Sequence, residues 1–279
     1  MPGSGIALQL SSFGARTIAL LATLGAFTRF ALATAAGVPA VRTWSRHGRF
    51  RTQLFRVGTL SVPVLMVTGA FIGMVLAIEG YLQFQSVGQE TRLGGVINVS
   101  VVKQIGPVLA AVILAGRVGC SLTAELGAMR VSEQLDAMRA LAADPIRVLV
   151  VPRVIACAAM IPVLTVVSNV CGVFGGWLVC TQFYPTDPVL YWEFSRAFVS
   201  WFDLTNGLVK SVCFGIAIGL IACWKGFTCR PGAVGVGKAT TESFVTSFMA
   251  IIVMNLMLAK LFNELDLWRT GGELSPIFG

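Results

Sequence analysis

Charged residues are scarce in this sequence. Only 12% of its 279 residues are Asp, Glu, Lys or Arg, and 56% are hydrophobic. A typical soluble domain carries about 25% charged residues, so this composition excludes an ordinary soluble fold. The short alternating segments of a membrane β-barrel are absent as well, which leaves helices as the spanning elements. We predict an all-α, polytopic membrane protein.

Side chains of the kinds used for metal binding and catalysis are also few. The chain has one histidine, His47, and its seven cysteines form no Cys-x-x-Cys pair. This pattern does not favour a metal centre, and cysteines within apolar segments are typical of small buried hydrophobic residues. The sequence shows no nucleophile paired with a base and no basic stripe interleaved with aromatic residues. It therefore indicates neither an enzyme nor a nucleic-acid partner.

A phosphate-binding loop is approached but not completed. Residues 232–240 read GAVGVGKAT, close to the pattern Gly-x4-Gly-Lys-Ser/Thr, but Ala239 occupies the position of the metal-binding hydroxyl. The segment also lies between two apolar runs, whereas a phosphate loop follows a buried strand. We interpret it as a flexible Gly-rich hinge before the last span. We expect no cofactor in this chain, with ATP and Mg bound by a separate ATPase subunit.

Five apolar runs are long enough to cross a bilayer, which takes roughly 20 residues of helix. They are residues 57–78, 93–116, 154–186, 204–224 and 243–259. The third is longer than one straight crossing needs, so we expect it to tilt, kink or project. We predict a five-span domain over residues 53–263 and a periplasmic tail over 264–279.

The first 52 residues differ from the spans. Two apolar runs, 17–28 and 30–41, are split by Arg29, and each is shorter than the roughly 17 residues a span requires. We predict an interfacial helix lying on the membrane, followed by a basic stretch. A cleaved signal peptide is the alternative, supported by Arg16 and the short apolar run. The basic cluster at 42–56 instead favours retention on the cytoplasmic side.

The basic residues also predict an orientation. With the N-terminus inside, 15 of the 21 Lys and Arg residues are cytoplasmic: seven up to Arg56, five in 117–153 and three in 225–238. Arg92, Arg196 and Arg269 fall outside. The positive-inside rule therefore places the N-terminus in the cytoplasm and the C-terminus in the periplasm.

The polar segment at 117–143, between the second and third spans, predicts a short amphipathic helix. Ser132 is a plausible N-cap, with Glu133 and Asp136 in the first turn. The helix should end near Ala143, since Asp144-Pro145 is typical of the start of the next helix. If a helix also runs through Glu125, then residues 125, 129 and 133 form one row. The alternative is a solvated helix resting on the headgroups.

Two lysines lie inside predicted spans, where a charge is costly. Lys103 precedes Gly106-Pro107 in the second span, and Lys210 lies early in the fourth. Each could extend to the outer interface or face a polar cavity that accepts a lipid headgroup.

Three Gly-x-x-x-Gly spacings also occur in the spans, a pattern that lets helix backbones approach closely. The pairs are Gly69 with Gly73, Gly172 with Gly176, and Gly215 with Gly219. Packing within the chain and packing at a subunit interface both remain open from the sequence.

A set of motifs in fixed order resembles the MlaE/YrbE family of ABC-transporter permeases, which handle lipids. The signature part is ELGAMR at 125–130, EQLDAM at 133–138, Asp144-Pro145 and Pro152-Arg153. Further similar motifs are GAFIGMVL at 69–76, Gly106-Pro107, AGRVG at 115–119, LVKS at 208–211 and GVGKATT at 235–241. Together they cover roughly residues 50–262.

The resemblance implies an interfacial helix plus five spans in a bacterial inner (cytoplasmic) membrane, a homodimer, a cytoplasmic ABC ATPase and a periplasmic MCE-domain partner. It implies that the segment between the second and third spans contains a coupling helix that docks the ATPase. The coupling residues would be Glu125, Arg130, Glu133, Gln134 and Asp136. The lipid pathway would include Leu76, Tyr81, Gln104, Ile105 and Lys210.

One departure from the family pattern concerns the second span. Relatives often carry Arg-Glu before the Gly-Pro, whereas this chain has Lys103-Gln104 followed by Ile105. The lysine is thus left without a neighbouring carboxylate, which puts a salt bridge there in doubt. The alternative function, an ion-coupled secondary transporter of a hydrophobic small molecule, is disfavoured by the odd span count and by acids that lie in loops or at span ends.

Overall fold

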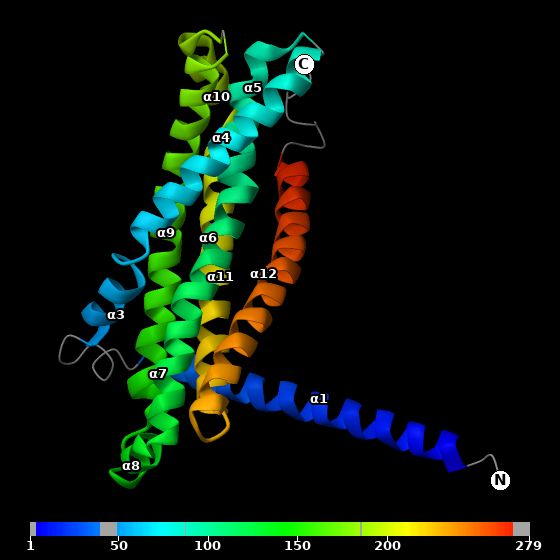
Figure 1. Cartoon of the computed structure of the whole chain (residues 1–279), viewed down its shortest axis with the longest axis vertical. Coiled ribbons are helices and arrows are strands. Elements are labelled where there is room, and N and C mark those ends of the chain that lie inside the picture. The colour runs from blue at the N-terminus through cyan, green and yellow to red at the C-terminus, as the bar shows by residue number, and fades with distance from the viewer. Residues whose placement is uncertain (1–3, 40–48, 87, 185, 270–279) are drawn as a thin grey trace.

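The computed structural model describes residues 4–39, 49–86, 88–184 and 186–269, and within them all regular structure is helical (Figure 1). Five helical segments are long and apolar enough to cross a membrane. They are Phe50–Ser86, Leu93–Val131, Ile146–Gln182, Trp201–Phe227 and Ala233–Arg269. A shorter apolar helical stretch lies near the N-terminus. The predicted class, an all-α polytopic membrane protein with five spans, is therefore confirmed.

The N-terminal helix α1 (Ser4–Gly37) projects sideways from the bundle (Figure 1). It is a single helix through Arg29, so the two predicted apolar runs are parts of one element that ends before Val41. Its Phe30 ring is buried against Trp224 and Phe227, with ring centroids 5.3 and 5.7 Å away. From Ile18 to Leu32, where its side chains are described, apolar side chains such as Leu21 are exposed, as a helix lying on a membrane requires.

Neither of the first two spanning segments is one regular α-helix. The first combines the basic helix α3 (Arg49–Val57) with α4 (Val62–Ser86). The second runs continuously through five pieces: α5 (Leu93–Ser100), η3 (Val101–Ile105), α6 (Gly106–Leu114), η4 (Ala115–Gly119) and α7 (Cys120–Val131). Both η3 and η4 are π-helical turns, a geometry often found at functional sites. Part of the basic stretch predicted at 42–56 is thus helix α3; residues 40–48 lie outside the described residues.

The remaining spans also extend beyond their apolar runs. The π-helical turn η5 (Ile146–Val150) leads into α9 (Val151–Gln182), and α11 (Trp201–Phe227) precedes α12 (Ala233–Arg269). Because α12 continues to Arg269, the beginning of the predicted tail is helical. The Arg269 guanidinium lies 5.4 Å from the centroid of the Phe202 ring on α11. Residues 270–279 lie outside the described part.

A further helix, α10 (Pro188–Phe198), covers the end of the bundle opposite α8 (Gln134–Ala140) (Figure 1). The sequence reasoning did not predict it, although Asp187 and Pro188 form a recognisable helix start: Asp187 Oδ1 accepts a hydrogen bond of 2.8 Å from Val189 N. It is attached to α5 by buried polar contacts. Asn98 Nδ2 donates to Ser195 Oγ at 2.6 Å, and the Tyr191 hydroxyl donates to Asn98 Oδ1 at 3.2 Å.

The Gly-x-x-x-Gly pairs pack within the chain. A Cβ atom on Gly73 would overlap the backbone of Gly172, so α4 and α9 cross at backbone contact. A Cβ on Gly219 would lie 3.0 Å from the Cα of Val154, so α11 also packs closely against α9. Such crossings bury the small residues and leave the larger apolar side chains outside. Helix α9 is therefore the central element against which the first and fourth spans pack.

Candidate functional site

In the segment between the second and third spans, the boundary between the two helices lies elsewhere than predicted. Helix α7 continues through Glu125 and ends only at Val131, so Ser132 is its C-cap and not the N-cap of the next helix. The Ser132 hydroxyl donates back to the Ala128 carbonyl at 2.8 Å. Glu133 is the N-cap of α8, with a φ of 59° and no side-chain capping bond. This left-handed residue interrupts the helix, so the conditional row of residues 125, 129 and 133 does not form.

The end of this segment agrees with its prediction. Helix α8 ends at Ala140, before Ala143. Asp144 Oδ1 accepts a hydrogen bond of 3.0 Å from Ile146 N, which starts the next helical element. Buried Leu135 anchors α8, whereas Gln134 and Asp136 are exposed. Helix α8 thus presents polar side chains at the end of the bundle nearest α1 (Figure 1).

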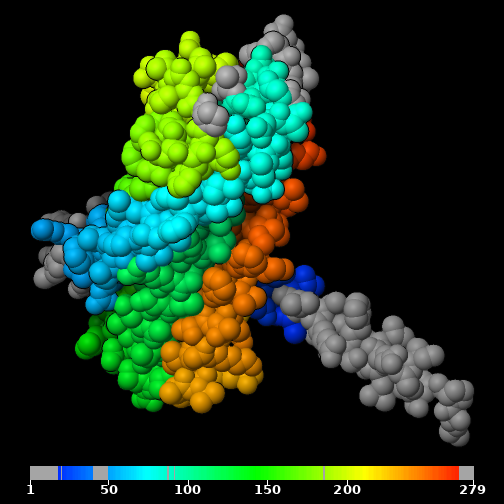
Figure 2. All heavy atoms as spheres, turned by 45° about the horizontal axis from the view of Figure 1, so that its top comes forward, coloured from blue at the N-terminus to red at the C-terminus, as the bar shows by residue number. Residues whose placement is uncertain are grey.

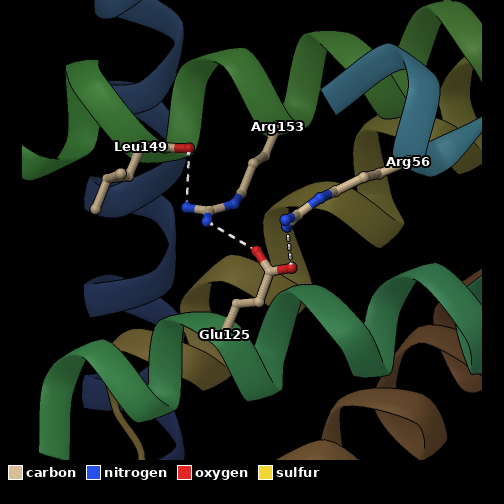
Figure 3. A network of polar contacts seen from close by, with 4 residues as sticks. All are labelled: Arg56, Glu125, Leu149 and Arg153. Carbon is tan, nitrogen blue, oxygen red and sulfur yellow. Dashed lines mark hydrogen bonds and ion pairs between the residues drawn. The ribbon is translucent and has the colours of Figure 1, made fainter. Parts of the chain in front are cut away.

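Glu125 lies between two arginines from different spans (Figure 3). Its Oε1 is 2.6 Å from Arg56 Nη1 at the end of α3, and its Oε2 is 3.1 Å from Arg153 Nη2 on α9. The Arg153 side chain is only 4% exposed, and its Nη1 also donates to the Leu149 carbonyl at 3.4 Å. We call Arg56, Glu125 and Arg153 the Glu125 network. It joins the corresponding ends of the first three spans.

Arg130 makes a similar connection to the fourth span. Its Nη1 donates to the carbonyl of Phe227 at the end of α11, at 2.6 Å. Of the five residues proposed for coupling, Glu125 and Arg130 therefore contact other spans of this chain. The other three, Glu133, Gln134 and Asp136, are exposed on or beside α8.

A second polar group lies within the spans. Lys103 Nζ is 3.1 Å from Asp203 Oδ1, and Lys210 Nζ donates to Gln104 Oε1 at 2.7 Å. We call Lys103, Gln104, Asp203 and Lys210 the polar cluster. Lys210 is 1% exposed, so it does not extend to the outer surface. The carboxylate that the second span lacks is supplied by the fourth span.

Local sequence explains how the polar cluster is positioned. Lys103 and Gln104 lie in the π-helical turn η3, immediately before Gly106-Pro107. Pro107 has no N–H to donate to the Lys103 carbonyl, and Lys210 Nζ lies 3.4 Å from that oxygen. Asp203 is held by a capping box in which its carboxylate accepts from Ser200 N at 3.2 Å. That Ser-x-x-Asp pattern was the sequence signal that could have identified Asp203.

The proposed lipid-pathway residues fall into two groups. Gln104 and Lys210 meet in the polar cluster, and Ile105 is half-buried next to Gln104. Tyr81 is instead buried, stacked on Tyr184 with ring centroids 3.9 Å apart, and Leu76 packs against the same apolar cluster. The structure therefore does not bring all five residues to one place.

Asn206 is a residue of the site that sequence reasoning missed. It lies on α11 between Asp203 and Lys210 and is 1% exposed. Neither polar atom of its side chain has a hydrogen-bond partner among the described residues. A buried amide without partners is costly, which marks this face of α11 as one where a polar ligand group or water would be stabilised.

The Gly-rich segment at 232–240 is not a hinge. Gly232 makes the turn, with a φ of 91°, and α12 begins at the next residue. Gly235 and Gly237 are therefore inside a helix. Among the described residues no group of three His, Cys, Asp or Glu side chains is placed to hold a metal ion.

Comparison with known proteins is consistent with this architecture. Residues 50–261 match the family model described as Permease MlaE. A probable ABC transporter permease protein of Synechocystis is 42% identical over 209 residues, covering 75% of this chain and 80% of that protein. A probable ABC transporter permease protein of Rickettsia bellii is 37% identical over 252 residues, 90% of this chain and 96% of that one. The intermembrane phospholipid transport system permease protein MlaE of Haemophilus influenzae is 32% identical over 253 residues, with 90% and 96% covered.

The Glu125 network predicts the effect of Glu125→Ala on stability. The substitution leaves buried Arg153 without a carboxylate, and breaking a buried pair costs about 3–5 kcal/mol. Because Glu125 is 29% exposed, we expect a smaller loss, about 2–3 kcal/mol. Thermal unfolding of the purified chain in detergent would measure it.

The matched control is Asp136→Ala, which removes an exposed pair with Arg139 and should cost at most about 1 kcal/mol. The double variant Glu125→Ala, Arg153→Met should recover part of the loss, since no unpaired buried charge remains. Equal unfolding temperatures for the two single variants would contradict this assignment.

Proposed function

Because this chain belongs to the MlaE permease family of ABC transporters, we propose that it moves phospholipid or a related lipid between the inner membrane of a bacterium and a periplasmic MCE-domain protein. The observation that carries the proposal is the polar cluster. Its charged side chains lie inside membrane spans whose outer faces are apolar. Charges in that position are typical of a pathway for a polar or charged part of a substrate. The name of the Haemophilus influenzae relative supports a phospholipid as the substrate.

A separate cytoplasmic ATPase, binding ATP and Mg, would supply the energy. Exposed Glu133, Gln134 and Asp136 at α8 are the proposed docking surface. Arg130 and the Glu125 network connect this region to the ends of all of the first four spans. Closure of the ATPase would therefore displace these span ends together, and the two arrangements of the spans would differ in their affinity for lipid.

Within the membrane, the headgroup would meet the polar cluster and the acyl chains the apolar faces of the spans. Lys103 is the partly exposed cation of the cluster, 26% accessible, whereas Asp203 and Lys210 are more deeply placed. Lys103 is thus positioned to attract a phosphate while Asp203 limits how strongly it binds. A binding site that must also release its lipid requires such a balance.

The proposed assembly is a homodimer with the N-terminus in the cytoplasm and the C-terminus in the periplasm. The basic residues of α3, α7, α8 and η5 gather at one end of the bundle, which supports this orientation. The outer faces of α4 and α12 expose large apolar side chains, including Phe71 and Val75 on α4 and Met249 and Leu256 on α12. A second copy and lipid would cover these faces.

Docking of the ATPase predicts that Glu133→Arg uncouples the complex. The side chain is exposed and outside the Glu125 network, so the fold should persist while the reversed charge weakens docking. In the complex purified with its ATPase, we expect ATPase retention and lipid transfer to fall about tenfold. Glu193→Arg, an exposed charge reversal on α10 at the opposite end, is the control. Full retention and transfer with Glu133→Arg would show that α8 is not the docking surface.

The polar cluster predicts a change in cargo binding with Lys103→Met. Removing the partly exposed cation should lower the amount of phospholipid that co-purifies with the complex by about fivefold, as read by mass spectrometry. Lys260→Met removes an exposed lysine near the end of α12 and is the matched control. The pair variant Lys103→Met, Asp203→Asn separates the loss of the cation from an unpaired carboxylate. Unchanged phospholipid in both variants would exclude the cluster from the pathway.

A further inference from the structure

A pocket of about 370 Å³ lies beside the Glu125 network, where α3 and the turn that follows it pass η4 and α7. Its polar lining is Gln53, Arg56, Arg117, Ser121 and Glu125, and its apolar lining is Val57, Leu60, Val118 and Leu122. This volume is within the range of about 300–1,000 Å³ typical of small-ligand sites. The lining is amphiphilic, with arginines and aliphatic side chains on the same pocket.

Positive charge in this pocket exceeds negative charge. The Glu125 carboxylate is already shared between Arg56 and Arg153. Arg117, in the π-helical turn η4, is exposed, and its guanidinium makes no hydrogen bond or ion pair within the described part of the chain. The pocket lining thus holds two arginines and a single carboxylate that is also paired with Arg153, and an anion bound between Arg56 and Arg117 would neutralise the surplus positive charge. Guanidinium groups bind phosphate through paired, charge-assisted hydrogen bonds.

An unpartnered acceptor completes the lining. The side-chain oxygen of Gln53 is buried and has no hydrogen-bond partner among the described residues. A buried amide oxygen is stabilised by a donor, such as a hydroxyl or an ammonium group. The pocket therefore offers two cations for a phosphate and one acceptor for a neighbouring donor. Phospholipid headgroups carry this combination of a phosphate next to a hydroxyl or amine.

The position of the pocket favours a lipid over a free anion. It adjoins α3, which carries Arg49, Arg51 and Arg56 and directly precedes α4, the apolar part of the first span. Figure 2 shows α3 and α4 in blue and light blue across one face of the molecule. Leu60, between α3 and α4, is exposed and would contact acyl chains. In the proposed orientation this level is the cytoplasmic leaflet, whose anionic lipids are attracted to basic segments next to a span.

We propose that this pocket binds the headgroup of an anionic phospholipid of the cytoplasmic leaflet, with its phosphate on Arg56 and Arg117 and its hydroxyl or amine on Gln53. The site lies at the span ends and is distinct from the polar cluster within the spans. It holds a resident lipid and does not depend on whether lipid is also the transported cargo. Because Arg56 belongs to the Glu125 network, an occupied site also stabilises the junction of the first three spans.

The test is native mass spectrometry of the full-length chain titrated with phosphatidylglycerol and, separately, with phosphatidylcholine. Phosphatidylglycerol should bind more tightly, and Arg117→Gln should weaken it about fivefold to tenfold, as expected for loss of a charge-assisted hydrogen bond. Arg147→Gln, an exposed arginine of η5 that does not line the pocket, is the matched control and should change binding less than about twofold. Gln53→Leu provides a second variant that leaves the charges in place and should also weaken binding.

Four outcomes would overturn the proposal. Equal losses with Arg117→Gln and Arg147→Gln would mean diffuse attraction without a site, and equal affinity for the two lipids would remove the anionic preference. If millimolar inorganic phosphate displaced phosphatidylglycerol, the pocket would be a free-phosphate site. If Arg117→Gln instead dissociated a dimer in the same spectra, the pocket would be an interface with a second copy of the chain.

Discussion

The carboxylate of Glu125 is the group on which the end of the bundle next to α8 depends. It bonds to Arg56 at the end of α3 and to buried Arg153 on α9, and it is itself part of the continuous second span. A buried guanidinium without a carboxylate would be costly, so the three span ends are stabilised only when they lie together. The same contacts connect α7, the helix that precedes α8, to the first and third spans. In the proposed function, a displacement of α8 would therefore reach several spans at once.

The polar cluster likewise joins charged side chains of different spans, here within the membrane. Lys103 and Asp203 are a hundred positions apart, yet they form an ion pair because the second and fourth spans pack side by side. Pro107 leaves the Lys103 carbonyl without its usual helical donor, and the Lys210 ammonium lies near that oxygen. Each charged side chain of the cluster has a partner within the chain. Asn206, which has no partner among the described residues, is adjacent to the cluster.

The sequence predicted the parts of this structure that depend on composition and local order. The apolar runs located all five spans, Asp144 marked the end of the segment after α8, and the ordered motifs identified the family. The incorrect predictions depend on contacts between spans that are distant in the sequence. The sequence indicates Ser132 as an N-cap because the second apolar run ends near Gly116. The helix instead continues through a charged stretch, in which Glu125 pairs with arginines of two other spans and Arg130 donates to a backbone carbonyl of the fourth. The partners of Glu125 lie 69 positions before it and 28 after it, and local spacing cannot reveal them.

We propose that the Glu125 network couples ATP hydrolysis by a partner ATPase to the movement of lipid. The most direct measurement is the number of phospholipid molecules transferred per ATP hydrolysed in proteoliposomes that contain the whole complex, compared between the native chain and Glu125→Gln. This substitution keeps the size of the side chain and its ability to accept a hydrogen bond, but removes the charge. The account predicts that ATP hydrolysis stays within about twofold while the transfer per ATP falls about fivefold or more. An unchanged ratio in a variant that folds normally would contradict it.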